Sequence, residues 1–129
     1  MDRTANQHAG IAAESVNGLN QRIRAALNHA EDSDLNRIKD AYEATASLKL
    51  LAMRLTLTAT EMKQLVDGWH QEGHLHSAPA VDTDAEATDF NTAMTKANKA
   101  ARALFIALDD ATKALAPMGW REEPATTTG

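Results

Sequence analysis

Small and apolar residues recur at every seventh position between residues 34 and 69, in two rows. The first row holds Ile38, Thr45, Ala52, Ala59 and Val66, and the second holds Ala41, Leu48, Leu55, Met62 and Trp69. Two rows offset by three residues form the heptad pattern of a helix that packs along one seam. The acidic run at 31–34 supplies an N-cap at Asp32 or Ser33, and Gly68 supplies an end. The pattern therefore predicts a helix over about residues 34–69.

A second heptad pattern follows after a loop of about a dozen residues. One row holds Phe90, Ala97, Leu104, Ala111 and Met118, and the other holds Met94, Ala101, Leu108 and Leu115. Thr83 and Glu86 have the spacing of a capping box, in which each side chain accepts a hydrogen bond from the other residue's backbone amide. Pro117 cannot continue a helix. These signals predict a helix over residues 83–116.

The first thirty residues carry a single apolar stripe. Its members are Ala12, Val16, Leu19, Ile23, Ala26 and Ala30, which alternate between spacings of four and three. Thr4 and Gln7 form a second candidate capping box. The stripe predicts an amphipathic helix over residues 5–30.

Together these elements predict an all-α fold, an up-down-up three-helix bundle built on a long antiparallel helical hairpin. Seven-residue seams joined by a short loop favour antiparallel packing of the second and third helices. We expect one domain over residues 1–119, followed by a flexible, disordered tail at 120–129, where the sequence carries little that can pack.

Helix lengths indicate where a partner would bind. At 1.5 Å per residue, the second and third helices would each be about 50–55 Å long and the first about 39 Å, so the first should not reach the hairpin tip. The apolar residues left there would be Met62, Leu65, Val66, Trp69, Phe90 and Met94. An exposed patch of this kind usually indicates an association site, and Trp and Met are favoured at the centres of interfaces. The alternative is that Trp69 and Phe90 close the tip against each other. Trp120 should pack near the turn between the first two helices.

Composition supports the helical assignment and narrows the function classes. Hydrophobic residues make up 43% of the 129 residues but aromatic residues only 4%, so Ala, Leu and Met must supply the packing. A net charge of -5 argues against a general nucleic-acid binder, and Lys96, Lys99 and Arg102 fit a solvated face. No cysteine is present, and no apolar run approaches the roughly 18 residues of a membrane span. We expect a cytoplasmic protein, with export lacking a cleaved signal left open.

Histidines supply the one candidate metal cluster. His70, His74 and His76 follow Trp69, and Glu72 or Asp82 could add an oxygen ligand. Gly73 interrupts the helical spacing that a His-Glu-x-x-His site needs. A metal- or pH-responsive loop is therefore kept as an alternative, while a solvated loop is favoured. No Ser-His-Asp set, phosphate loop or convergent carboxylate pair is evident, so we expect no catalysis, cofactor or small-molecule substrate.

The segment 34–116 resembles in shape the Trp-x-Gly substrates of type VII secretion, which are small helical hairpins with a tryptophan near the bend. The motif itself is absent, because Trp69 is followed by His70 and Gln71. Tyr42 also lacks an acidic residue four positions later, where Ala46 stands. The resemblance implies an exported helical-hairpin protein, which we keep as a second alternative.

The function that the sequence favours is that of a non-catalytic helical interaction or adaptor protein. It would bind itself, as a homodimer, or another helical protein through the uncovered hairpin tip, with Trp69 as the anchor.

Overall fold

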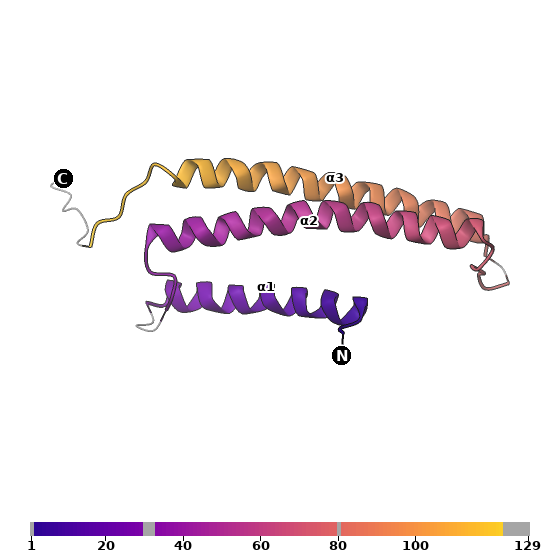
Figure 1. Cartoon of the computed structure of the whole chain (residues 1–129), viewed down its shortest axis with the longest axis horizontal. Coiled ribbons are helices and arrows are strands. Elements are labelled where there is room, and N and C mark those ends of the chain that lie inside the picture. Colours follow the sequence, from indigo (N-terminus) through magenta and orange to yellow (C-terminus); the bar gives the residue numbers. More distant parts are fainter. Residues whose placement is uncertain (1, 30–32, 80, 123–129) are drawn as a thin grey trace. The chain divides into compact units, whose positions relative to one another are not determined.

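The computed structural model describes residues 2–29, 33–79 and 81–122. These residues form three helices, α1 (Ala5–Leu27), α2 (Ile38–Gln71) and α3 (Thr83–Leu115), and no strand. The all-α fold built on a long antiparallel hairpin is therefore confirmed, because α2 and α3 run side by side in opposite directions (Figure 1). The predicted cap at Asp32, the end of the first helix at Ala30 and the tail from residue 123 onward lie outside the described residues.

The chain divides into two compact units. One comprises Met1–Ala41 with Gly119–Gly129, and the other comprises Tyr42–Met118. The second unit contains nearly all of the α2–α3 hairpin. The single domain over 1–119 and the packing of the first helix on the hairpin stay predictions.

The capping box at the start of α1 is confirmed. The Gln7 amide donates to Thr4 Oγ1 at 3.1 Å, and the Thr4 amide donates to Gln7 Oε1 at 2.9 Å. The helix ends at Leu27, earlier than predicted, where the His29 amide bonds to the Ala26 carbonyl and His29 adopts a φ of 56°. No residue of α1 is buried.

The second helix begins at Ile38, four residues later than predicted. Asp40 reaches back from the first turn, and its Oδ2 accepts hydrogen bonds from the Asn36 and Arg37 amides. The Ser33 hydroxyl instead accepts from the Leu35 amide at 3.2 Å, which closes a local turn. The acidic cap thus comes from inside the helix rather than from the residues before it.

Gly73 terminates α2, not Gly68. The Gly73 amide bonds to the His70 carbonyl and the His74 amide to the Trp69 carbonyl, the paired bonds of a Schellman motif. Gly73 has a φ of +79°, a conformation that favours glycine. Gly68 lies within the helix, which runs to Gln71.

Asp82, rather than Thr83, caps α3, so the capping box predicted for Thr83 and Glu86 is wrong. The Asp82 carboxylate accepts from the amides of Asp84 and Ala85. Thr83 is the first helical residue, and its hydroxyl donates to Ser77 Oγ at 2.9 Å. The helix ends at Leu115, one residue before the predicted end.

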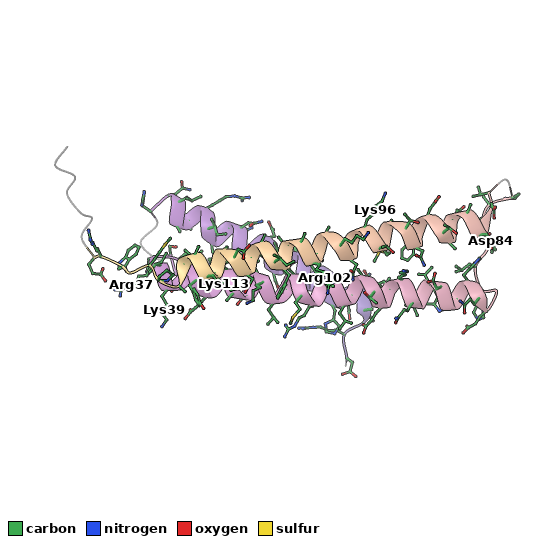
Figure 2. The ribbon with its side chains drawn as sticks, turned by 90° about the horizontal axis from the view of Figure 1, so that it is seen from above. Arg37, Lys39, Asp84, Lys96, Arg102 and Lys113 are labelled. Atoms are coloured by element: carbon green, nitrogen blue, oxygen red, sulfur yellow. The ribbon has the colours of Figure 1, made fainter. Side chains whose placement is uncertain are left out.

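The hairpin seam is lined by small and polar residues. Ala52 and Ala59 of α2 and Thr112 of α3 are buried. Asn91 and Asn98 bond across to α2, so the heptad row of α3 that faces α2 is Asn91, Asn98, Phe105 and Thr112. Each member follows by one position the row that the sequence suggested, and Leu104 of that suggested row is 48% exposed. Asp84 lies near the loop that joins the two helices and Lys113 near the opposite end (Figure 2).

Candidate protein-binding surface at the hairpin tip

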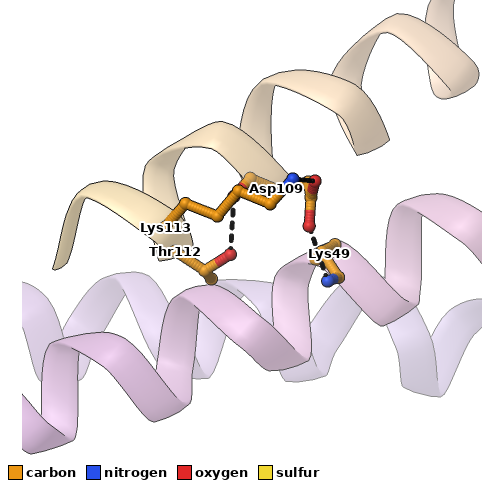
Figure 3. Close-up of polar contacts among 4 residues, drawn as sticks. All are labelled: Lys49, Asp109, Thr112 and Lys113. Atoms are coloured by element: carbon orange, nitrogen blue, oxygen red, sulfur yellow. Dashed lines mark hydrogen bonds and ion pairs between the residues drawn. The ribbon is translucent and has the colours of Figure 1, made fainter. Parts of the chain in front are cut away.

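One edge of the hairpin is a ladder of polar contacts between α2 and α3. At the end far from the loop, Asp109 accepts hydrogen bonds from Lys113 Nζ at 2.8 Å and Lys49 Nζ at 2.9 Å (Figure 3). The bond from Lys113, followed by that from Lys49, holds the pKa of Asp109 below its usual value. In return, Asp109 raises the pKa of Lys113. The Thr112 hydroxyl donates to the Asp109 carbonyl at 2.8 Å.

The middle of the ladder is centred on Asn98. Its Nδ2 donates to the Thr56 carbonyl at 2.9 Å and to Thr60 Oγ1 at 2.8 Å. One turn nearer the loop, Lys63 Nζ donates to Thr95 Oγ1 at 3.3 Å. As the chain advances along α2, the partner in α3 moves back correspondingly, which fixes the antiparallel register.

The ladder continues to the tip. Asn91 Nδ2 donates to Asp67 Oδ2 at 2.8 Å, and His70 Nε2 lies 2.9 Å from Asp84 Oδ1. Among the described residues, no buried side-chain polar atom lacks a hydrogen-bond partner. This edge of the hairpin is thus satisfied by contacts within the chain.

The opposite side of the hairpin carries two rows of uncharged positions on each helix, and we call these rows the uncharged face. It is formed by positions spaced alternately by four and three, which place them on one side of each helix. In α2 these are Ala44, Leu48, Leu51, Leu55, Thr58, Met62, Leu65 and Trp69. In α3 they are Ala87, Phe90, Met94, Ala97, Ala101, Leu104, Leu108, Ala111 and Leu115.

The residues predicted to bind a partner lie at the loop end of this face, with one exception. Met62 is 41% exposed, Leu65 46% and Trp69 43%, while Phe90 and Met94 are half-buried. Val66 belongs instead to the row that contains buried Ala52 and Ala59, and it is also half-buried. Leu55 and Leu104, at 44% and 48% exposed, extend the face away from the tip.

Sequence reasoning did not single out Leu55 and Leu104 because both were assigned to a buried seam. The signal that was missed is a seven-residue repeat of polar residues on both helices. In α2 it consists of Lys49, Thr56, Lys63 and His70, and in α3 of Asn91 and Asn98. Polar rows of matching period on two helices predict a polar edge between them. When these polar rows lie between the two helices, the rows that contain Leu55 and Leu104 turn toward solvent.

His70 at the end of α2 and His74 and His76 in the loop have separate partners. His70 pairs with Asp84, His74 Nε2 lies 3.2 Å from Glu72 Oε2, and His76 Nδ1 lies 3.2 Å from the Ser77 carbonyl. Over residues 2–29, 33–79 and 81–122, no group of three or more His, Cys, Asp or Glu side chains is placed to hold a metal ion.

Trp120 packs where the sequence placed it. It lines a hollow with Ala26 at the end of α1 and Ser33 and Ile38 at the approach to α2, all within one unit. The neighbouring Glu122 forms an ion pair of 2.7 Å with Arg37. The predicted position of Trp120 near the first turn is therefore confirmed.

Fold and surface together define a helical-hairpin protein with one polar, internally paired edge and one uncharged face. Within the described part of the chain, no helix combines the length and apolar character needed to cross a membrane. Comparison with known proteins gave no match, whether to a family model, a curated protein or a solved structure. The cytoplasmic location and the shape resemblance to type VII substrates stay predictions.

Proposed function

We propose that this chain is a non-catalytic interaction protein that binds a helical partner, either itself or another protein, through the loop end of its uncharged face. The observation that carries the proposal is the exposure of Met62, Leu65 and Trp69, each above 40%, on a face without charge. Large apolar side chains that adjoin in this way are typical of association sites.

The polar edge supports this choice of face. Its side chains already bond across the hairpin, so a partner there would have to displace existing contacts, such as Asn91 with Asp67. The uncharged face offers no such competition. Fully burying an exposed large apolar side chain contributes about 1.5–3 kcal/mol. Covering the exposed 41–46% of Met62, Leu65 and Trp69 would therefore supply a part of that value from each of the three side chains. The partner surface should accordingly be an apolar helix face.

The experiment compares two leucines of α2 that both project into solvent. Leu65 lies on the uncharged face and Leu57, 58% exposed, lies outside it in the row that continues with Gln64 and Gln71. We expect Leu65→Ala and Trp69→Ala to weaken association, measured by sedimentation velocity and by titration with any purified partner, while Leu57→Ala does not. If Trp69→Ala retained both its oligomeric state and its partner affinity, the tip would not be the binding surface.

A further inference from the structure

We propose that the partner is a second copy of this chain, and that two hairpins pack antiparallel with their uncharged faces together. This inference rests on the proposed function and extends the contact from the tip to the whole face. Three properties of the hairpin lead to it, namely its charge distribution, its exposed area and the spacing of its flanking charges.

The hairpin is acidic toward the loop and basic toward the other end. The half nearer the loop, residues 57–98, carries seven acidic residues and two lysines: Glu61, Asp67, Glu72, Asp82, Asp84, Glu86 and Asp89 against Lys63 and Lys96. The other half, residues 42–56 and 99–118, carries five basic and three acidic residues: Lys49, Arg54, Lys99, Arg102 and Lys113 against Glu43, Asp109 and Asp110. In Figure 2, Asp84 lies at the acidic end near the loop and Lys113 lies toward the basic end.

This distribution selects the orientation of a dimer. Two hairpins packed in parallel would bring two acidic tips together, and like charges across an interface suppress association. Packed antiparallel, each acidic half would lie against the basic half of the other copy. Part of the acidity near Asp82 serves the N-terminus of α3, but Glu61 lies on α2 and has no such role.

The area available fits a stable dimer. The α2 part of the hairpin, from Tyr42 to Gln71, is about 45 Å long, and two helices of about 10 Å diameter make a face of about 900 Å². A standard-size interface takes about 800 Å² from each partner.

A two-fold axis through the middle of the face would cross near Thr58, because Thr56 pairs with Asn98 at the centre of the hairpin. Such an axis would set α2 against α2 of the second copy, and Thr58 against its own equivalent. Arg54 and Glu61, which are seven residues apart and both exposed, flank the face on either side of that centre. Glu61 of each copy would then lie opposite Arg54 of the other.

Cysteine cross-linking tests the orientation directly, since the chain has no cysteine of its own. Ala44, Thr58 and Glu72 lie in one row, fourteen residues apart. Under mild oxidation we expect Thr58→Cys to cross-link to itself, and Glu72→Cys to cross-link with Ala44→Cys but not with itself. Leu57→Cys, off the face, is the control that measures random collision. Self-linking of Glu72→Cys, without linking to Ala44→Cys, would overturn the antiparallel arrangement.

Charge exchange tests the same geometry without oxidation. We expect Glu61→Arg or Arg54→Glu to raise the dimer dissociation constant about tenfold, because each reversal turns two attractive pairs repulsive. The double variant E61R/R54E should recover the original constant. Failure of the double variant to recover would contradict the pairing.

Solution mass separates this inference from the proposed function. We expect sedimentation equilibrium to give twice 13.9 kDa in the micromolar range. A monomer at millimolar concentration would overturn the second copy as partner. In that case, a purified helical partner whose binding still depends on Trp69 would leave the proposed function intact. A monomer without such a partner, with α1 packed over the face, would overturn both.

Discussion

At the scale of single residues, the polar side chains between α2 and α3 decide which rows of the helices meet. Asn98 is half-buried and reaches both the Thr56 carbonyl and the Thr60 hydroxyl. An asparagine in a helical seam specifies register at some cost in stability. The contacts of Asn98 explain why the row of α3 that faces α2 lies one position after the row that contains Leu104. The rotation also exposes Leu104.

Asn98→Ala should lower the free energy of unfolding by about 1 kcal/mol, because two part-buried hydrogen bonds are lost while helix propensity improves. Urea unfolding at one fixed protein concentration measures the change. Asn20→Ala, at an exposed position of α1, is the matched control and should be neutral or slightly stabilising. An unchanged stability of Asn98→Ala would show that the Asn98 contacts do not hold the seam.

The Asp109 cluster predicts a pH window for stability. The pKa of Asp109 is lowered by Lys113 and Lys49 from its usual 3.8, so its contribution is complete above that value and disappears as the pH falls through the lower folded-state pKa. The pKa of Lys113 is raised from 10.5, so its contribution is complete below that value and is lost as the pH rises through the higher folded-state pKa.

We expect Asp109→Asn to lower the melting temperature at pH 7 and to have progressively less effect below about pH 3.8. Asp110→Asn removes the same charge from the neighbouring exposed position and should lower the melting temperature less than Asp109→Asn at pH 7. Thermal unfolding followed by circular dichroism measures both variants. A penalty for Asp109→Asn that persisted undiminished at pH 2 would contradict the ion-pair explanation.

At the scale of elements, the two glycines near the end of α2 should respond in opposite ways to the same substitution. Gly73 has a φ of +79°, and nothing lies within 4 Å of an added Cβ, so Gly73→Ala should cost about 1 kcal/mol through backbone strain alone. Gly68 is helical and equally open, so Gly68→Ala should stabilise by up to about 1 kcal/mol. Chemical denaturation compares the two variants. Destabilisation by Gly68→Ala would mean that something packs against that position in solution.

Helix existence and order were predictable from the sequence, because the seven-residue periodicity and the Thr4–Gln7 box are local signals. The cap of α3 was harder, since Asp82 and Thr83 are both good N-caps and only the bonds to Asp84 and Ala85 distinguish them. The tip residues could be placed because they lie in the apolar rows. The full extent of the uncharged face could not be predicted from the sequence, because it depends on which of two neighbouring rows of α3 turns toward α2. Asn98 decides this through a contact distant in sequence.

At the scale of the whole molecule, burial is concentrated in the hairpin. Ala52 and Ala59 are buried in α2 and Thr112 in α3, whereas α1 has no buried residue. Helices in proteins owe most of their stability to tertiary packing rather than to helix propensity, and none of the 23 residues of α1 is buried. Regions with few buried contacts open at low free energy while the core opens only on global unfolding.

Native-state hydrogen exchange should therefore divide the chain. We expect the α2 amides between Ala52 and Ala59 to exchange at least about a hundredfold more slowly than the α1 amides between Ile11 and Ile23, because α1 can open alone. Repeating the measurement with Leu65→Ala, at protein concentrations above and below the dissociation constant of the dimer, separates protection by association from protection within one chain. Equal protection of α1 and α2 that is independent of concentration would show α1 packed as the third helix of a closed bundle. The uncharged face would then be occupied by the chain itself.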